Sequence, residues 1–197
     1  PTPPFEIASN SAIITEAETG QVLYSKDPDC KLYPASITKV LTALIALEKG
    51  NLEDIVTVSE NAMNNIGGTS HIALVPDEKL TLKDAMYGMM LQSANDCALA
   101  IAEHIAGSVP NFVKLMNEKA KSIGATNSNF VNPHGLQDEN HYTTAADMAK
   151  IVREAIKNPK YLEISGTKLY TMQPTNKQTD SRYFSNQNLM LHSGKYF

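Results

Sequence analysis

The chain has 197 residues, of which 42% are hydrophobic and 19% are charged, a composition typical of a globular protein with a buried core. Its formal net charge is −4 and it contains no long basic run, which argues against nucleic acid as its main partner. No apolar stretch reaches the roughly 18 residues that a membrane-spanning helix needs. The start, Pro1-Thr2-Pro3-Pro4, fits either a processed secreted protein or a recombinant product.

The first predicted element is a β-hairpin, which follows a disordered tail at residues 1–5. Residues 11–16 and 21–25 have the composition of strands. Residues 17–20 form the turn between them, where Gly20 suits a positive φ. Because a two-stranded hairpin is not stable alone, it needs further strands or a covering helix.

A helix is predicted over residues 35–49, because its apolar residues recur at three- and four-residue intervals and leave a stripe along one face. Gly50 ends this helix as a C-cap. Ser36 lies at the N-terminus of the helix, where free backbone N–H groups favour negative charge.

The middle of the chain is predicted to be helical. One helix starts after Thr81, which forms a capping box with Asp84. Three more helices each end at a stop signal: residues 95–106 before Gly107, residues 110–123 before Gly124 with Ser108 as the cap, and residues 144–157 before Asn158-Pro159. The loop between the last two, residues 126–143, is long and polar, and such loops are often functional. Weaker strand patterns follow at residues 168–172 and 188–192.

Strands near both ends with helices between them predict an α/β (α+β) fold, with a sheet built from the two ends of the chain and a helical insertion. We expect residues 1–53 and 160–197 to form the sheet-containing part and residues 54–159 to form a mainly helical subdomain. The predicted strands are too few to cover the helix at residues 35–49, so we expect the sheet to be incomplete in this chain.

Two short motifs carry chemistry. Ser36 and Lys39 are three residues apart at a helix start, so their side chains share one face and can reach each other. A serine hydroxyl is a poor nucleophile until a neighbouring base takes its proton, and a buried lysine can be that base. Ser93-Ala94-Asn95 adds the second member of the set Ser-x-x-Lys, Ser-x-Asn and Lys-Thr-Gly. The alternatives are a helix cap for Ser36, a solvated lysine for Lys39, and a capping loop for the second motif.

With these motifs in this order, the chain resembles the penicillin-binding D-alanyl-D-alanine carboxypeptidases, the low-molecular-mass serine peptidases of bacterial cell walls. The matching stretches run through nearly the whole chain: Glu18 to Tyr24, Pro34 to Lys39, Leu91 to Asp96, and Asn132 to Leu136. The resemblance implies a β-lactamase- or transpeptidase-like fold, with the active site in the cleft between an antiparallel sheet and a helical subdomain. It also implies a location outside the cytoplasmic membrane, where the peptidoglycan lies.

The resemblance implies a role for each motif residue. Ser36 would attack the carbonyl between the two terminal D-alanines of a peptidoglycan stem peptide, and β-lactam antibiotics would acylate it covalently. Lys39 would be the base, Ser93 would relay a proton toward the leaving amine, and Asn95 would hold the substrate amide and orient the lysine. The backbone N–H of Ser36 would form half of an oxyanion hole. No cofactor or metal is expected, since the five histidines show no metal-ligand spacing.

The third motif, Lys-Thr-Gly, does not occur in residues 1–197, and Ser193-Gly194-Lys195 is not that motif. In the family it follows an Asn-x-Asn-x-x-Leu region, here residues 186–191. We therefore expect a truncation, with the missing strands on a second chain, lost to proteolysis or left out. A neutral lysine at pH 7 costs about 4.6 kcal/mol, and the Lys-Thr-Gly lysine would help as a nearby cation. We predict that Lys39 is less well activated in this chain alone.

Two other functions remain open. A class A-like β-lactamase shares both motifs, but it needs a glutamate to activate the deacylating water, and no Glu-x-x-Leu-Asn string follows Asn95. A non-catalytic module that binds cell-wall peptides or β-lactams would bind reversibly, without a covalent adduct on Ser36.

Four further residues have weaker predictions. We expect Cys30 and Cys97 to be free thiols and Cys97 to pack as a small hydrophobe, although its place one turn after Ser93 leaves inhibition by thiol reagents open. His71, in the stretch Gly67-Gly68-Thr69-Ser70-His71, is expected to be a loop residue near the cleft. For His134 we expect a structural role in a turn, and the alternative is a place at the border of the cleft.

Overall fold

The computed structural model describes residues 7–63 and 66–192. The predicted tail and the string Ser193-Gly194-Lys195 lie outside the described residues. The α-helices in the described part are α1 (Lys39–Lys49), α2 (Leu82–Gln92), α3 (Asn95–Ala106), α4 (Val109–Ser122), α5 (Ala145–Ala155) and α6 (Pro159–Gly166). The strands are β1 (Ala12–Thr15), β2 (Val22–Lys26), β3 (Ile55–Thr57), β4 (Lys79–Thr81), β5 (Leu169–Met172) and β6 (Arg182–Ser185). Short 3-10 turns are η1 (Ala35–Thr38), η2 (Asn61–Met63) and η3 (Leu189–Leu191).

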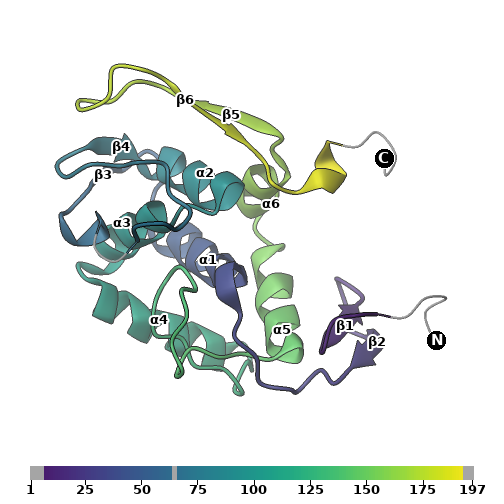
Figure 1. Cartoon of the computed structure of the whole chain (residues 1–197). Coiled ribbons are helices and arrows are strands. Elements are labelled where there is room, and N and C mark those ends of the chain that lie inside the picture. Colours follow the sequence, from purple (N-terminus) through teal and green to yellow (C-terminus); the bar gives the residue numbers. More distant parts are fainter. Residues whose placement is uncertain (1–6, 64–65, 193–197) are drawn as a thin grey trace.

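Helix α1 lies at the centre of the molecule, and each of α2, α3, α4, α5 and α6 packs against it (Figure 1). Its side chains Leu41, Leu44 and Ile45 are almost fully buried. Burial of each such side chain contributes roughly 1.5–3 kcal/mol. The packed helix therefore fixes the position of the preceding turn η1, which carries Ser36.

The predicted N-terminal hairpin is confirmed as the antiparallel pair β1–β2, and Gly20 in its turn has φ 77°. Helix α5 covers one side of the hairpin, as a two-stranded sheet requires. From α5, the Arg153 guanidinium donates hydrogen bonds to the carbonyls of Ala17 and Glu18 at 3.2 and 3.0 Å. A Cβ at Gly20 would lie 2.3 Å from that guanidinium, so the Arg153 side chain would have to move, whereas the positive φ itself favours glycine in the turn.

The predicted helix ends are largely confirmed. Thr81 and Asp84 form the capping box of α2, and α3 ends at Gly107 with φ 74°. Ser108 caps α4 through a hydrogen bond from the Asn111 N–H. Gly50 ends α1 as its C-cap, as predicted, and it does so in an extended conformation.

Helix α6 is absent from the predicted elements, because Asn158-Pro159 indicates only the end of the preceding helix. The structure shows that Asn158 also caps the next helix, with its side chain accepting the Lys160 N–H, and that Pro159 is the first helical residue. Proline suits that position because its missing N–H would have no partner there. The strand predicted at residues 188–192 is wrong as well, since Asn188 caps the turn η3 instead.

Strands β3, β4 and β6 were also missed. They have three or four residues each, too few for an alternating pattern to stand out. The described strands form three separate antiparallel pairs, β1–β2, β3–β4 and β5–β6, so the strands of the two ends do not pair with each other. Figure 1 shows β5–β6 over α2, with β1–β2 beside α5 on the other side of the molecule. The proposed division into residues 1–53 with 160–197 and residues 54–159 stays a prediction.

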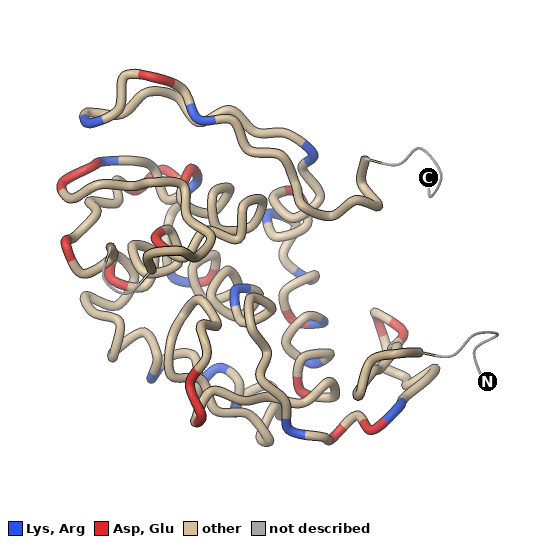
Figure 2. Tube along the Cα trace, in the orientation of Figure 1, with Lys and Arg blue, Asp and Glu red and all other residues tan. Residues whose placement is uncertain are grey.

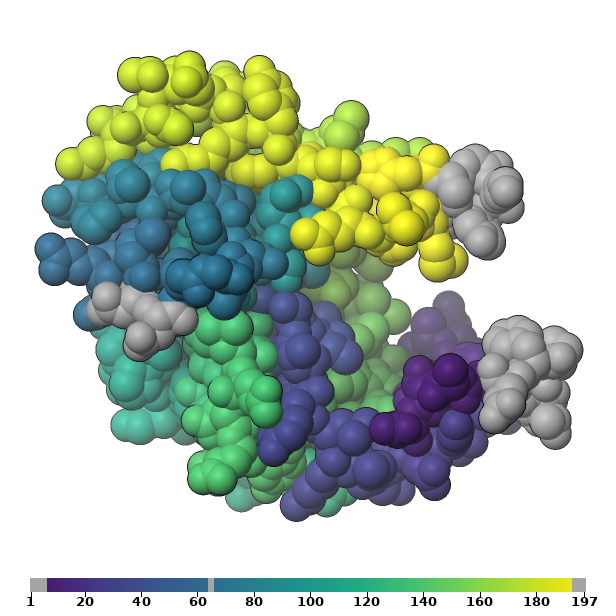
Figure 3. All heavy atoms as spheres, in the orientation of Figure 1, coloured from purple at the N-terminus to yellow at the C-terminus, as the bar shows by residue number. Residues whose placement is uncertain are grey.

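The surface is mixed in charge, and Figure 2 shows basic and acidic residues interspersed along the trace. Figure 3 shows a hollow between the N-terminal hairpin and the segment around η3. An apolar groove of about 510 Å³ lies between the hairpin and α5, and its lining includes Ile13, Ile37, Met148, Val152 and Ile156. No helix within residues 7–63 and 66–192 has both the length and the apolar character needed to cross a bilayer.

Candidate active site

Ser36 and Lys39 meet as their spacing predicts. Ser36 lies in η1 and is exposed, whereas Lys39 begins α1 and is only 3% exposed. The Lys39 Nζ atom is 3.1 Å from Ser36 Oγ, which is hydrogen-bond distance. The exposed hydroxyl of Ser36 therefore forms a hydrogen bond with the buried amine of Lys39.

Burial lowers the pKa of Lys39 to about 8, because a buried ammonium loses its hydration. An amine with that pKa is roughly nine-tenths protonated at pH 7. Burial thus supplies most, but not all, of the shift that a base at neutral pH requires. The expectation that Lys39 is less well activated here than beside a second cation stays a prediction.

The loop at residues 132–136 binds along the first turn of α1. Lys39 Nζ donates a hydrogen bond to the carbonyl of His134 at 2.8 Å, and Thr42 Oγ1 donates one to the carbonyl of Pro133 at 2.6 Å. The Lys39 amine is therefore held between the serine hydroxyl and a backbone carbonyl. Both acceptors fix the direction in which the amine points.

Asn132 closes this loop on itself. Its side-chain oxygen accepts the Gly135 N–H at 2.7 Å, and its amide nitrogen donates to the carbonyl of Leu136 at 2.9 Å. Gly135 has φ 89°, and a Cβ there would lie 1.8 Å from the carbonyl oxygen of Ala35. Ala35 itself has φ 50°, which is uncommon for alanine. The residue before Ser36 and the loop that binds Lys39 therefore pack backbone against backbone.

Two buried histidines support the same loop. Burial lowers the pKa of His134 to about 4, and the nearby charge of Lys39 acts in the same direction. The Nδ1 atom of His141 accepts the Val131 N–H at 3.1 Å, so its proton is on Nε2, which donates to Thr38 Oγ1 at 2.8 Å. Burial also lowers the pKa of His141. The sequence favours a turn role for His134 over a place at the border of the cleft, and in the structure its backbone carbonyl accepts the hydrogen bond from Lys39.

Ser93 and Asn95 flank the start of α3. Ser93 is half-buried and takes a left-handed conformation at the end of α2, with φ 57°. Asn95 is 4% exposed, and its amide nitrogen donates to Thr69 Oγ1 at 2.9 Å. Its Oδ1 atom is buried without a hydrogen-bond partner. In the described part of the chain no hydrogen bond joins either residue to Ser36 or Lys39, so their proposed roles remain to be tested.

Asp96 is a residue that the sequence reasoning did not single out. Its carboxylate is fully buried and accepts the N–H groups of Ile72 and Leu74, each at 3.1 Å from Oδ2. These bonds fold the segment after His71 onto the start of α3. His71 itself is an exposed loop residue. The signal was present in the sequence, since Asp96 ends the matching stretch that begins at Leu91.

Both cysteines are free, as predicted. Cys97 is fully buried, and this burial raises the pKa of its thiol well above the ordinary value. A thiolate is the reactive form of cysteine. The structure therefore gives no basis for inhibition by thiol reagents at Cys97, which packs against Gly88 instead.

The family model for D-alanyl-D-alanine carboxypeptidases, peptidase family S11, matches residues 1–197. The D-alanyl-D-alanine carboxypeptidase DacF of Bacillus subtilis is 43% identical over 164 residues, covering 81% of this chain and 42% of that protein. The chain spans about half the length of the curated relatives it matches. The comparisons give no support to a second chain that carries a Lys-Thr-Gly strand.

Two solved structures share the fold. The S216A mutant of Streptomyces K15 DD-transpeptidase has a TM-score of 0.89 and 28% identity, covering 96% of this chain and 78% of that one. Penicillin-binding protein 5 from Haemophilus influenzae has a TM-score of 0.86 and 34% identity, covering 98% and 56%. The predicted α/β fold of the DD-transpeptidase and β-lactamase type is thereby confirmed. The chain belongs to the D-alanyl-D-alanine carboxypeptidase family of serine peptidases, family S11.

Proposed function

We propose that the protein is a serine-type D-alanyl-D-alanine carboxypeptidase, which removes the terminal D-alanine from peptidoglycan stem peptides and is acylated by β-lactams. One observation carries the proposal: in a chain of this family, an exposed Ser36 hydroxyl lies 3.1 Å from the buried amine of Lys39. We also propose that it works outside the cytoplasmic membrane, because its substrate lies there.

In the first half of the reaction, neutral Lys39 takes the proton of Ser36 as the serine oxygen attacks the carbonyl between the two D-alanines. The negative oxygen of the tetrahedral intermediate is stabilised by backbone N–H donors, among them that of Ser36. The carbon–nitrogen bond then breaks. The proton that Lys39 took from Ser36 passes through Ser93 to the leaving amine, which departs as D-alanine. This step leaves an acyl group on Ser36 and returns Lys39 to its neutral form.

In the second half, a water molecule attacks the acyl ester. Lys39 takes the proton of that water and returns a proton to the Ser36 oxygen, which restores the free enzyme. Asn95 is proposed to hold the amide of the substrate. Its amide nitrogen is engaged by Thr69, so the unpartnered Oδ1 is the atom left to accept a hydrogen bond from a substrate N–H. The hydrogen bond from the Lys39 amine to the His134 carbonyl keeps the base aligned through both halves of the reaction.

The two alternatives differ from this proposal in what happens to penicillin. A carboxypeptidase releases the penicilloyl group slowly, whereas a β-lactamase turns it over fast. A binding module forms no covalent adduct. Adduct formation therefore separates the binding module from the two enzymes, and the rate of release of the penicilloyl group separates the carboxypeptidase from the β-lactamase.

The test is intact-mass spectrometry of the complete gene product before and after benzylpenicillin, followed by peptide mapping. We expect a penicilloyl adduct on Ser36 that persists over minutes to hours, and release of D-alanine from a stem-peptide substrate. The Ser36→Ala variant should form no adduct. A Ser11→Ala variant, which removes, just before the hairpin, a half-buried hydroxyl that donates to the Asp27 carbonyl, should react as the wild type does. Reversible penicillin binding with no adduct on any residue would contradict the proposal.

A further inference from the structure

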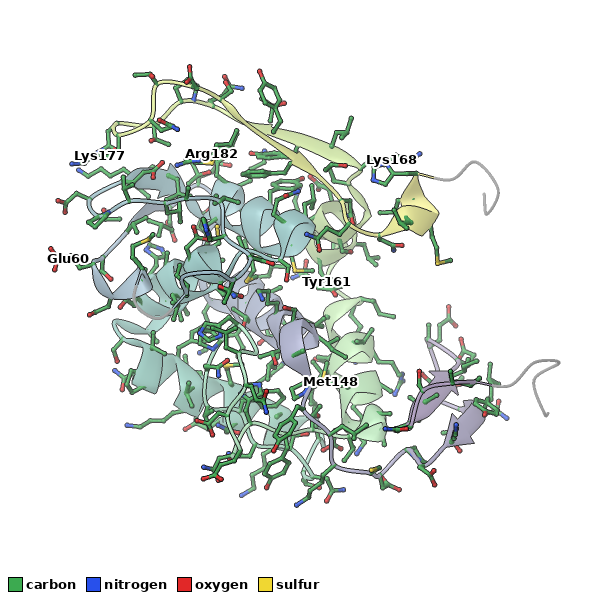
Figure 4. All side chains as sticks on the ribbon, viewed as in Figure 1. Glu60, Met148, Tyr161, Lys168, Lys177 and Arg182 are labelled. Carbon is green, nitrogen blue, oxygen red and sulfur yellow. The ribbon has the colours of Figure 1, made fainter. Side chains whose placement is uncertain are left out.

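Arg182, at the start of β6, forms a bidentate ion pair with a fully buried carboxylate. Its Nη1 atom donates to Glu78 Oε1 at 2.6 Å and its Nη2 atom donates to Oε2 at 3.1 Å. The side chain of Glu78 is 0% exposed and that of Arg182 is 12% exposed. Figure 4 shows Arg182 pointing from the β5–β6 hairpin toward the β3–β4 side of the molecule. The pair therefore joins the hairpin near the C-terminus to the segment before β4.

The paired carboxylate is satisfied on every side. Thr175 Oγ1 donates to Oε1 of Glu78 at 2.8 Å, and the Val75 N–H donates to Oε2 at 3.1 Å. Burial alone would raise the pKa of Glu78, but the hydrogen bonds from Arg182 and Thr175 and the charge of Arg182 outweigh it, so the pKa is lowered. Removal of one partner of such a pair leaves a buried charge uncompensated, which is strongly unfavourable.

The Arg182–Glu78 pair and Asp96 both bind the backbone of one short segment, residues 72–75. Arg182 Nη2 donates to the carbonyl of Ala73 at 3.1 Å, and Glu78 accepts the N–H of Val75. Asp96 accepts the N–H groups of the residues between and before them, Leu74 and Ile72. Every residue from 72 to 75 thus has a backbone group bound by one of three charged side chains. Ala73 takes φ 57°, so this backbone shape needs such support.

The residues just before this segment accept hydrogen bonds from Asn95. The Asn95 backbone N–H donates to the carbonyl of Ser70 at 2.8 Å, and its side-chain amide donates to Thr69 Oγ1. These acceptors lie only a few residues before the segment at 72–75, and Asp96 directly follows Asn95. The orientation of the Asn95 amide therefore depends on where this loop is held.

We propose that Arg182 and Glu78 are positioning residues that fix the loop at residues 69–75 against the start of α3 and so orient the Asn95 amide toward the substrate. The functional half of this proposal rests on the carboxypeptidase activity proposed above. Its structural half concerns the free protein alone. The two halves are tested separately.

The first experiment is hydrogen exchange on the complete gene product and its Arg182→Met variant. The N–H groups of Ile72, Leu74 and Asn95 should exchange about tenfold faster in the variant, because the loop opens more often. The control is Arg153→Met, since Arg153 is the other arginine of the chain. Like Arg182 it donates to backbone carbonyls, but these lie in the turn of the β1–β2 hairpin. This control variant should accelerate exchange at Gly20 and leave Asn95 unchanged. Unchanged exchange at Asn95 in the Arg182→Met variant would overturn the proposal whatever the enzyme does.

The second experiment is a double-mutant cycle between Arg182→Met and Asn95→Ala, with the second-order rate of Ser36 acylation by benzylpenicillin as the measure. Alone, Arg182→Met should lower that rate about tenfold, and in the Asn95→Ala background it should lower it no more than about twofold. Equal losses in both backgrounds would show that Arg182 acts independently of Asn95 and would overturn the proposal.

Two further variants keep the test decisive if Arg182→Met folds poorly. Arg182→Lys keeps the charge but loses the bidentate geometry, so it should fall between the wild type and Arg182→Met in both measurements. Glu78→Gln removes the buried charge of Glu78. This substitution should slow acylation in the wild-type background and have little effect on acylation in the Asn95→Ala background. If the wild type itself forms no adduct, the proposed activity fails, while hydrogen exchange at Asn95 still decides whether Arg182 positions the loop.

Discussion

At the scale of single residues, the proposed reaction rests on the pairing of an exposed serine with a buried lysine. In that proposal, exposure lets a substrate carbonyl reach Ser36 Oγ, and the lowered pKa of buried Lys39 favours the neutral form that takes a proton. A lysine at the surface would keep its ordinary pKa and remain charged. The carbonyl of His134 gives the buried amine the hydrogen bond that it would otherwise lose with its water.

The pKa of Lys39 predicts the pH dependence of acylation. Because only neutral Lys39 accepts a proton, the second-order rate of penicillin acylation should rise about tenfold per pH unit below pH 8 and level off above it. Stopped-flow measurements between pH 6 and 10 give this profile. Lys39→Arg should be inactive throughout, since arginine stays protonated. A wild-type profile that still rises steeply above pH 9 would exclude Lys39, with its lowered pKa, as the base.

Gly135 is a second residue whose identity the structure requires. In the Gly135→Ala variant, the new Cβ would meet the Ala35 carbonyl oxygen at 1.8 Å, at a φ that alanine rarely adopts. The loop must shift, which moves the His134 carbonyl away from Lys39. We expect about 1–3 kcal/mol of lost stability and at least tenfold slower acylation.

The matched control for this substitution is Gly166→Ala. Gly166 ends α6, has no positive φ, and a Cβ there would meet nothing within 4 Å. This variant should melt at or slightly above the wild-type temperature and react at the wild-type rate. If both glycine variants behave alike in thermal melting and acylation, the close approach of Gly135 to Ala35 affects neither stability nor acylation, and the prediction is wrong.

At the scale of elements, Asp84 joins helix α2 to the β5–β6 hairpin. Its carboxylate accepts the Thr81 hydroxyl at 2.6 Å within the capping box, and it accepts the Tyr170 hydroxyl at 2.7 Å from β5. The Tyr170 ring stacks on Tyr87 of α2 with centroids 3.8 Å apart. One carboxylate therefore both starts a helix and holds a hairpin of which the sequence pattern predicted only the first strand, β5.

Asp84→Ala should lower the free energy of unfolding by about 1–2 kcal/mol, because the helix loses half of its capping box and the hairpin loses its anchor. Chemical denaturation at pH 7 measures this change. Tyr170→Phe keeps the ring stack and removes only the hydroxyl bond, so it should cost less than Asp84→Ala. An equal cost for the two variants would mean that the capping box contributes nothing to stability.

The sequence predicted the elements that carry strong local signals and missed those that depend on partners. The capping box at Thr81 and the hairpin turn at Gly20 follow from local chemistry, and both are confirmed. Strand β6 exists because it pairs with β5 and packs on α2, which no local pattern records. In the same way, the spacing of Ser36 and Lys39 predicted their contact, whereas the His134 carbonyl reaches Lys39 across 95 residues of sequence.

At the scale of the whole molecule, folding places two histidines in the interior in their neutral form. His134 Nδ1 accepts the Leu136 N–H at 3.1 Å, and His141 Nδ1 accepts the Val131 N–H at the same distance. A proton on either Nδ1 would break its bond and put a charge in a buried site, which is why both pKa values are lowered.

This burial couples the stability of the fold to pH. The pKa of His134 is about 4 in the folded state and about 6.5 in an unfolded chain. Between these values the unfolded chain binds more protons, so the free energy of unfolding falls as the pH falls, by up to about 3 kcal/mol for this residue. The stability contributed by neutral His134 is complete above pH 6.5 and is lost by about pH 4. Urea denaturation at intervals between pH 4 and 7 should show this decline.

Two variants, each with asparagine in place of a histidine, test whether the loss of stability at low pH comes from the burial of His134. His134→Asn cannot take up a proton in this range, so its stability curve should be flatter than that of the wild type between pH 4 and 6.5. His71→Asn is the matched control, because His71 Nδ1 also accepts an N–H two residues on, that of Ala73 at 3.0 Å, but the side chain is exposed. Its curve should follow the wild type. Carboxylates such as Glu78 add to the acid loss in all three proteins, so the difference between curves isolates His134. Parallel curves for the wild type and His134→Asn would show that this histidine is not buried in its neutral form.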